Sequence, residues 1–316
     1  MPGLLDIVLG YDCNLACDYC TITPAMRARA LSRTQVLAQL RRGRADDYDA
    51  ISLTGGEPTI VADLLGLVKA ARALGFADVK LQSNGLMFAA PGNVARLCAA
   101  GVTRFHVSIH THRADRYDAL VRRAGAYPLM VRGLDAVVRS GRTVVAEVIL
   151  KEDTYRDLPE ALGWLHARGV RRADLWFVSL TDANAAHPAS MPPMTAVVPV
   201  MAEGLAFARA HDMQVRSLHV PRCLLGPDHV HAHDPGAQRV RVVTPEATFE
   251  LRHSQLTGQR HVPACAGCRF EARCPGLRPD YLARYGDVEI ARARGQAPTR
   301  VGTAAVALPL WSDALS

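Results

Sequence analysis

Apolar and polar positions alternate between two patterns over residues 1–215. Short apolar runs, typical of buried strands, occur at residues 4–9, 50–54, 79–83, 104–109, 144–150 and 173–178. Amphipathic helical spacing follows them, in a first helix capped by Ser32 and then at 62–74, 94–100, 129–139, 158–167 and 197–210. Six strand–helix repeats predict right-handed crossovers and a parallel sheet. Because a closed barrel takes eight such units in about 250 residues, we expect an open α/β fold, a partial, TIM-like (β/α)6 barrel.

The pattern changes after residue 212. Residues 213–220 suit one more strand, and runs at 239–243 and 247–252 flank Thr244-Pro245-Glu246 as the arms of a β-hairpin. The sequence that follows is irregular and punctuated by Pro, Gly and Cys. We therefore expect a barrel over residues 1–215, a small cysteine-bearing module with the hairpin over 216–290, and a tail over 291–316.

Composition narrows the class of protein. Hydrophobic residues make up 49% of the 316 positions, which is enough for a globular core. The sequence has no apolar run of about 18 residues and no secretory signal pattern, so we expect a cytoplasmic protein without a membrane partner. The net charge of +7 comes mostly from arginine, and no nucleic-acid-binding module is recognisable, so we expect no nucleic-acid partner.

The cysteines give the first sign of chemistry, because thiols in such a protein are more often metal ligands or buried than disulfide-bonded. Of the eight, Cys13, Cys17 and Cys20 share the loop directly after the first strand. Three thiolates from one loop can hold three irons of a [4Fe–4S] cluster and leave the fourth iron open to a further ligand. A zinc knuckle or buried free thiols are the alternatives, although no fourth Cys or His follows within about 30 residues to complete a tetrahedral zinc site. Cys98 fits the apolar face of a helix.

A second cysteine set lies near the carboxyl end of the chain. It consists of Cys223, Cys265, Cys268 and Cys274. Four thiolates complete a [4Fe–4S] cluster without an open iron, and they are an equally good set for a structural zinc ion. The His-Val-His-Ala-His run at 229–233 offers an alternate ligand, although a polar loop is the plainer interpretation.

Polar motifs follow the next strands at the carboxyl edge of the predicted sheet, where the functional loops of such barrels gather. They are Gly55-Gly56-Glu57-Pro58 after the second strand, Ser83-Asn84 after the third and Ser108 at the end of the fourth. Glu147 lies in the apolar fifth strand, and a carboxylate there needs a partner, so we expect it to face the cavity. Candidates for substrate contact by position alone are His110, His112, Trp176 and Asp182.

The Cys-x3-Cys-x2-Cys loop, with Tyr19 before its last cysteine and with Gly-Gly-Glu-Pro about 40 residues later, resembles the radical S-adenosylmethionine (SAM) family. The resemblance implies that the open iron chelates SAM through its amino and carboxylate groups. It further implies that one electron from the cluster cleaves the carbon–sulfur bond of SAM, and that the resulting 5′-deoxyadenosyl radical takes a hydrogen atom from the substrate.

The same resemblance implies roles for the rim residues. Gly55 and Gly56 let the backbone approach the methionyl part of SAM, and Glu57 of this Gly-Gly-Glu-Pro motif accepts a hydrogen bond from the SAM amino group. Further contacts are implied for Ser83-Asn84, which stands where relatives have Thr-Asn, for Ser108 near the SAM ribose or carboxylate, and for Tyr19 against the adenine.

The second cysteine set is similar to that of SPASM and twitch domains, which also bring a β-hairpin. Four cysteines rather than seven match the one-cluster twitch form, so this resemblance implies an auxiliary [4Fe–4S] cluster. The layout from Pro221 to Tyr285-Gly286 is also similar to that of small radical SAM proteins that include the maturases of His-Xaa-Ser peptides.

Three functions follow as hypotheses. The first is a radical SAM oxidoreductase or maturase that modifies a peptide or protein and takes electrons from a flavodoxin- or ferredoxin-type donor. Because the sequence begins almost at the first strand, this hypothesis calls for a separate peptide-recognition protein. The second is a radical SAM dehydrogenase of a small molecule such as an aminosugar. The third, a non-enzymatic cluster carrier or zinc protein, predicts no SAM cleavage.

Overall fold

One sheet organises the part of the chain that the computed structural model describes, residues 3–251 and 260–295. The sheet has nine strands in the order β7-β6-β5-β4-β3-β2-β1-β8-β9. They are β1 (Gly3–Val8), β2 (Ala50–Thr54), β3 (Asp78–Ser83), β4 (Arg104–Ser108), β5 (Thr143–Leu150), β6 (Arg172–Phe177), β7 (Gln214–Leu218), β8 (Arg239–Val243) and β9 (Thr248–Glu250). Neighbours from β7 to β8 are parallel, and β9 runs antiparallel to β8. The predicted α/β partial barrel is confirmed, with more parallel strands than the six repeats suggested.

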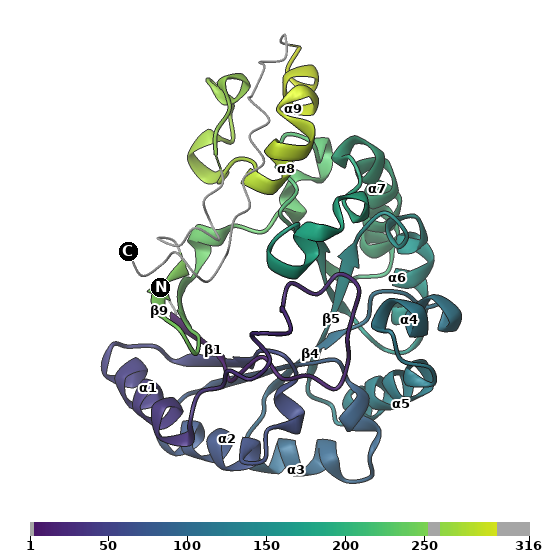
Figure 1. The fold of residues 1–316 in the computed structure, drawn as a ribbon. Coiled ribbons are helices and arrows are strands. Elements are labelled where there is room, and N and C mark those ends of the chain that lie inside the picture. Colours follow the sequence, from purple (N-terminus) through teal and green to yellow (C-terminus); the bar gives the residue numbers. More distant parts are fainter. Residues whose placement is uncertain (1–2, 252–259, 296–316) are drawn as a thin grey trace.

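Helices cover the convex, outer side of the curved sheet (Figure 1). They are α1 (Arg33–Ala45), α2 (Leu64–Ala73), α3 (Asn93–Ala100), α4 (Ala114–Val121), α5 (Ala126–Arg139), α6 (Leu158–Ala167) and α7 (Met194–Ala210). Side chains of β1 show the two faces: Leu5 and Ile7 are fully buried, whereas Asp6 between them stays partly exposed. Leu5 packs against Gly43 of α1, so its face is the one beneath the helices. The opposite, concave side is called the lumen below.

Helix α4 was not expected, because the segment after β4 reads as a polar loop. Its apolar residues are few but fall at helical spacing, and Tyr117, Leu120 and Val121 are all buried. The same segment matters for the site, because the carbonyl oxygens of Leu120 and Val121 accept hydrogen bonds from the backbone of the first cysteine loop.

The predicted boundary between barrel and C-terminal module, at residues 215 and 216, falls within strand β7. Strand β7 pairs with β6, so a boundary at residues 215–216 would cut through it. The predicted hairpin exists as β8 and β9, but β8 lies parallel to β1 and extends the barrel sheet. Strand β1 would otherwise leave a row of unpaired backbone groups at the edge of the sheet, and β8 satisfies them. Arg252 at the end of the predicted hairpin, and the tail beyond residue 295, lie outside the described residues.

The C-terminal module consists of residues 260–295 with helices α8 (Pro279–Tyr285) and α9 (Val288–Ala293), and it lies beyond α7 in Figure 1. The buried Arg278 joins it to the barrel: its guanidinium pairs with Asp280 at 2.8 Å and donates to the carbonyl oxygens of Phe177 and Val178 at the end of β6. Glu289 of α9 accepts a hydrogen bond from the Thr195 backbone N–H at 2.8 Å and so caps the first turn of α7. The module is therefore attached to the carboxyl rim of the barrel.

One segment, Pro188–Ala210, is long and apolar enough to cross a membrane by length and composition, and 44% of its most apolar stretch is buried within the fold. Its helix α7 packs on α6, where Gly204 lets Leu158 and Leu162 approach closely. We interpret the apolar character of α7 as that of a core helix.

Candidate active site

The first cysteine loop crosses the concave side of the sheet (Figure 1). Cys13, Cys17 and Cys20 are free thiols and are each partly buried. Burial, together with the neighbouring Cys20 and Cys13, raises the pKa of Cys17 to about 12. Three thiols that disfavour one another's ionisation in a partly dry site are costly to deprotonate unless a cationic metal group compensates them. Their convergence fits the predicted iron–sulfur site.

Backbone N–H groups point at two of the three sulfurs. The N–H of Leu15 donates to Cys13 Sγ and that of Ile22 donates to Cys20 Sγ, both at 3.4 Å. The Asn84 side-chain amide lies 4.0 Å from Cys13 Sγ and donates to Asn14 Oδ1 at 2.7 Å. Donors directed at sulfur stabilise thiolate charge, as a cluster ligand requires.

Gly55 and Gly56 bring the turn after β2 against this loop. The N–H of Gly56 donates to the Gly10 carbonyl oxygen and the N–H of Glu57 donates to that of Asp12, both at 2.8 Å. A Cβ on Gly56 would lie 2.0 Å from the Asp12 oxygen, and one on Gly55, whose φ is +136°, would lie 2.3 Å from the Gly10 oxygen. The glycines thus permit a close approach to the cysteine loop, and their approach to the methionyl part of SAM stays a prediction.

Sequence reasoning missed two basic residues that hold the loop. The buried Lys151, just past β5, pairs through Nζ with Asp18 Oδ2 at 2.9 Å. Arg27 donates to the carbonyl oxygens of Cys13 and Leu15 at 2.9 and 2.8 Å. A signal for Lys151 did exist, because it is one of three lysines in the chain and directly follows a buried strand.

Glu57 is buried at the meeting point of β2 and β3. Its Oε1 accepts hydrogen bonds from the Ser83 hydroxyl at 2.8 Å and the Thr59 N–H at 2.9 Å, and its Oε2 accepts one from the Asn84 N–H at 2.8 Å. Burial raises the pKa of Glu57, and the Thr59, Asn84 and Ser83 donors oppose this shift. Oε2 has only that one partner among the described residues, so it keeps capacity to accept a further hydrogen bond. Pro58 follows as the first residue of a 3₁₀ turn.

Tyr19 and His110 contact each other at the rim. Their rings meet edge to face with centroids 4.6 Å apart, and the Tyr19 hydroxyl oxygen lies 2.5 Å from His110 Nε2. Ser108 ends β4 opposite Glu147 in the register of β4 and β5. Contacts of Tyr19 and Ser108 with SAM stay predictions.

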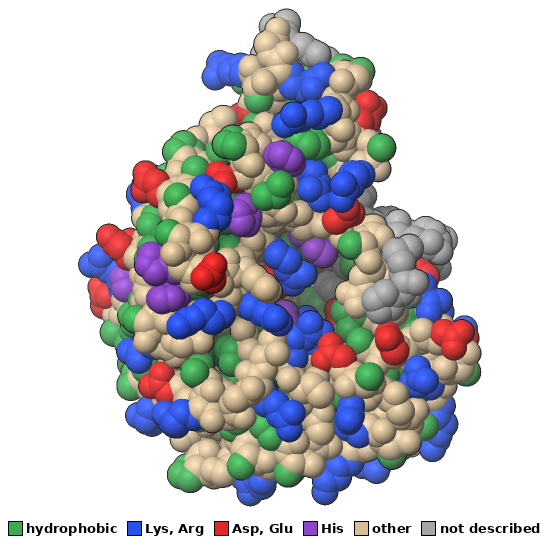
Figure 2. All heavy atoms as spheres, turned by 180° about the vertical axis from the view of Figure 1, so that it is seen from behind, with side chains coloured by type: hydrophobic (Ala, Val, Ile, Leu, Met, Phe, Trp, Pro, Cys, Tyr) green, Lys and Arg blue, Asp and Glu red, His purple; other side chains and the backbone are tan. Residues whose placement is uncertain are grey.

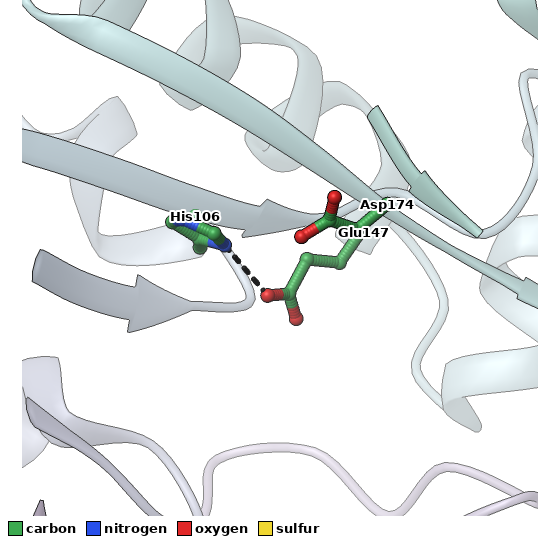
Figure 3. A group of neighbouring side chains, drawn as sticks. All are labelled: His106, Glu147 and Asp174. Carbon is green, nitrogen blue, oxygen red and sulfur yellow. Dashed lines mark hydrogen bonds and ion pairs between the residues drawn. The ribbon is translucent and has the colours of Figure 1, made fainter. Parts of the chain in front are cut away.

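A polar cluster lies in the lumen, where His106 of β4, Glu147 of β5 and Asp174 of β6 point toward one another (Figure 3). Glu147 Oε1 lies 2.8 Å from His106 Nδ1, and Oε2 accepts from the Gln82 side chain at 2.7 Å. Arg216 donates to both oxygens of Asp174. Each carboxylate oxygen therefore already has a protein donor, so we interpret the cluster as a closed network rather than a cation site.

The lumen location of Glu147 agrees with expectation, but its partners were missed. Burial raises the pKa of Glu147, and burial lowers that of His106 well below its usual value, so this imidazole is neutral. The missed signal was polar residues at every second position of β4 and β6. Of the substrate-contact candidates, Trp176 has a buried Nε1 and His112 a buried Nδ1 without a hydrogen-bond partner among the described residues. Asp182 begins a 3₁₀ turn beyond β6.

The second cysteine set surrounds one cavity in the C-terminal module. Its four thiols line the cavity together with Phe270, Leu277 and Ile290. Burial raises the pKa of Cys223 to about 11, and the Cys268, Cys274 and Cys265 thiols add to this shift. His229 and His231 turn their Nδ1 atoms to backbone carbonyl oxygens instead.

No three thiols of either cysteine set all lie within 4.8 Å of one another in this structure. Among the described residues, His106, Glu147 and Asp174 are the one set of at least three potential ligands whose atoms all lie within 4.8 Å of one another. A tetrahedral zinc site with bonds of about 2.3 Å would bring its sulfurs within roughly 3.8 Å of one another. In neither cysteine set do the sulfur atoms all lie that close to one another.

Comparisons with known proteins agree with this geometry. The sequence profile of the Radical SAM superfamily matches residues 7–165. GTP 3′,8-cyclase 3 of Mycobacterium bovis is 31% identical over 193 residues, which cover 57% of this chain and 49% of that protein. A probable GTP 3′,8-cyclase of Methanopyrus kandleri is 32% identical over 149 residues, covering 46% and 47%. The chain thus spans about half the length of the curated relatives it matches.

Solved structures share the fold. Streptococcus suis SuiB bound to S-adenosylmethionine has a TM-score of 0.67 at 12% identity, over 89% of this chain and 74% of SuiB. Native anSMEcpe with bound AdoMet and the Cp18Cys peptide has a TM-score of 0.64 at 11% identity, over 93% and 98%. Both matches extend over most of this chain.

Proposed function

The chain belongs to the radical SAM superfamily, and on this premise we propose that Cys13, Cys17 and Cys20 hold the [4Fe–4S] cluster that reductively cleaves SAM. The family uses this cluster and SAM. When bound, the two together supply a 5′-deoxyadenosyl radical that abstracts a hydrogen atom from the substrate. The observation that carries the proposal is the convergence of three thiols with a glycine turn that only glycine can form.

The protein's own residues provide position and shielding. Glu57, through the remaining capacity of Oε2, would accept a hydrogen bond from the SAM amino group, and Asn84 orients Asn14 beside Cys13. Lys151 and Arg27 would help to position the loop for SAM through their contacts with Asp18 and the Cys13 carbonyl oxygen. Ser83 keeps Glu57 in place through its hydroxyl.

We propose a second [4Fe–4S] cluster on Cys223, Cys265, Cys268 and Cys274. The four thiols line one cavity of the module, which supports a single cluster held by all four. Such a cluster would supply a one-electron acceptor or a substrate ligand at the barrel rim, where Arg278 attaches the module.

The substrate we propose is a peptide that presents a polar side chain to the lumen. Support comes from the extent of the fold, because SuiB bound to its precursor peptide SuiA also matches, with a TM-score of 0.63 at 14% identity over 78% of this chain. The closed network of His106, Glu147 and Asp174 gives the lumen a polar wall without itself binding the substrate. A flavodoxin- or ferredoxin-type donor and a separate peptide-recognition protein complete the proposal.

A small polar molecule, such as a nucleotide or an aminosugar, is the second candidate. The identity to GTP 3′,8-cyclases favours it. From behind, Lys, Arg and His side chains stand around a hollow near the middle of the molecule (Figure 2), which suits an anionic ligand.

Anaerobic reconstitution tests the cofactor assignments. We expect about eight irons and eight sulfides per chain, and 5′-deoxyadenosine on addition of dithionite and SAM. The triple variant Cys13→Ala, Cys17→Ala, Cys20→Ala should form none, whereas Cys98→Ala, which removes a partly buried thiol of α3, should behave as wild type. Formation of 5′-deoxyadenosine by the triple variant would refute the site.

The substrate is tested by stimulation of the same reaction. A peptide encoded beside this gene should raise 5′-deoxyadenosine formation, and deuterium on its modified residue should appear in the product. If GTP or an aminosugar stimulates and transfers deuterium instead, the peptide proposal is wrong and the second candidate holds.

A further inference from the structure

A row of three polar side chains crosses the lumen face of strands β1, β2 and β3. The register pairs Asp6 with Ser52 and Ser52 with Lys80, so the three residues lie side by side on neighbouring strands. Because paired residues of a sheet share one face, the lumen position of Asp6 places Ser52 and Lys80 in the lumen as well. The alternate positions of the same strands face the helices and are fully buried and apolar: Leu5, Ile7, Ile51, Leu53, Val79 and Leu81.

The fold leaves these polar side chains without partners. Ser52 is 0% exposed, and its hydroxyl oxygen has no hydrogen-bond partner among the described residues. The same holds for the buried Oδ1 of Asp6, although the Asp6 side chain is otherwise partly exposed. A buried polar group without a partner costs free energy, so nearly all such groups in proteins are paired. Two of them side by side indicate a place where a ligand supplies the missing hydrogen bonds.

Lys80 also keeps its charge available. The lumen acids on the strands beside it are paired with other side chains, as Asp78 is with Arg104, and no ion pair of Lys80 occurs in the part of the chain that the structure describes. Burial raises the pKa of Glu147 and the charge of Lys80 opposes this shift, so the ammonium group faces the same lumen. The row therefore offers an acceptor at Asp6 and a donor at Lys80.

The charges of the row define the kind of group that it fits. Adjacent strands lie about 4.8 Å apart, so the backbones of Asp6 and Lys80 are about 10 Å apart with Ser52 between them. A carboxylate only accepts hydrogen bonds, an ammonium group only donates them, and a hydroxyl does either. Because the two charges cancel, the matching group is neutral and has a donor beside an acceptor. An amide has this pattern.

We propose that Asp6, Ser52 and Lys80 form a subsite for an amide group of the substrate, with Asp6 accepting from its N–H and Lys80 donating to its carbonyl oxygen. The row lies two or three residues before the carboxyl ends of its strands, about 7–10 Å below the rim. A substrate held there presents its neighbouring atoms to the candidate active site, so the inference rests on the proposed function. The amide belongs either to an Asn or Gln side chain of a peptide or to the lactam edge of a purine.

The chain has three lysines, which gives binding at Lys80 a direct readout. In the reconstituted protein with lysine labelled by carbon-13 at Cε, the variant Lys80→Met identifies the NMR signal of this residue. Lys69 is exposed on α2 and Lys151 is paired with Asp18, so their signals are internal controls. The protein is titrated separately with N-acetyl-asparagine amide and guanosine, and with N-acetyl-leucine amide as the apolar control.

The two amide probes distinguish the two sources. We expect the Lys80 signal to shift saturably with the asparagine amide if the substrate is a peptide, or with guanosine if it is a purine, and not with the leucine amide. Asp6→Asn should raise the dissociation constant about tenfold, because the amide N–H loses a charged acceptor. Asp115→Asn is the matched control on the exposed first turn of α4, and it should leave the dissociation constant unchanged.

Ser52→Ala tells a ligand site from a hydroxyl that has a structural partner, such as a buried water molecule. If only a ligand satisfies the hydroxyl, its removal should raise the midpoint of thermal unfolding of the ligand-free protein and weaken binding of the probe. A lower midpoint would show that the hydroxyl stabilises the fold itself.

Three outcomes overturn the inference: neither amide probe shifts the Lys80 signal, the leucine amide shifts it as much, or Ser52→Ala lowers the unfolding midpoint. These measurements do not depend on SAM cleavage. A wild-type protein that forms no 5′-deoxyadenosine would refute the proposed function, which is a different result.

Discussion

Replacing Gly56 by alanine should leave the protein folded and disable its cysteine loop. The new methyl group would lie 2.0 Å from the Asp12 carbonyl oxygen and 2.5 Å from that of Tyr11. Both obstacles are backbone atoms, so no side-chain rotation can relieve the overlap. The residues that must move are those directly before Cys13.

The size of the effect follows from the two hydrogen bonds at this contact. Carbon contacts below 3.0 Å are essentially never seen, so the Asp12 carbonyl must retreat by about 1 Å. The bonds from Gly56 N to Gly10 O and from Glu57 N to Asp12 O, now 2.8 Å, then lengthen beyond hydrogen-bond distance. At about 1 kcal/mol each, their loss costs about 2 kcal/mol, which is less than the roughly 5–15 kcal/mol stability of a typical domain.

The assay compares folding with loop function. Thermal unfolding of the apo protein should show a folded Gly56→Ala variant with a modestly lower midpoint, while 5′-deoxyadenosine formation after reconstitution should fall to near zero. Gly163→Ala is the matched control, because a Cβ there meets only Phe207 at 3.8 Å and alanine is a better helix former by about 1 kcal/mol. Wild-type 5′-deoxyadenosine formation by Gly56→Ala would show that the loop does not depend on this contact.

Three further predictions concern pH, docking and metal content. Because burial holds the pKa of His110 near 3, the unfolded chain takes up a proton at this histidine before the folded protein does, and the free energy of unfolding falls as the pH drops below about 6.5. In urea titrations of the apo protein, His110→Phe should make this pH dependence shallower by about 1.4 kcal/mol per pH unit between pH 5 and 6. An equal pH dependence in the variant and the wild type would contradict the prediction. Arg278→Met should cost about 3–5 kcal/mol because Asp280 is left buried without its charged partner; a loss of less than about 1 kcal/mol in urea unfolding would argue against the pair. Cys265→Ala with Cys268→Ala should leave about four irons per chain and continued 5′-deoxyadenosine formation, whereas stoichiometric zinc in the wild type would refute the second cluster.

Local patterns predicted the strands, most helices and both cysteine sets, because each depends on residues a few positions apart. Helix α4 was not predicted because its apolar stripe is short and lies among charged residues. The position of the hairpin was not predicted either. The sequence of β8 specifies a strand, but its pairing with β1, more than 200 residues earlier, depends on which edge of the sheet is left open.

Site residues divide in the same way. Cys13, Cys17, Cys20 and the glycine turn could be found from spacing, since one loop and one turn carry them. Lys151 and His110 could not be given roles, because their partners Asp18 and Tyr19 are distant in sequence and meet them only where strand ends come together.

The sequence by itself determined where three thiols occur in one loop, where glycine is available and which residues alternate toward the lumen. Only the tertiary structure decided which groups those residues contact. A hydrogen bond has a direction that depends on its neighbours, and His110 Nε2 donates to the Tyr19 hydroxyl oxygen only because the Ile149 N–H, on another strand, has already occupied His110 Nδ1. That dependence on strand register is a property of the folded sheet, and no local pattern encodes it.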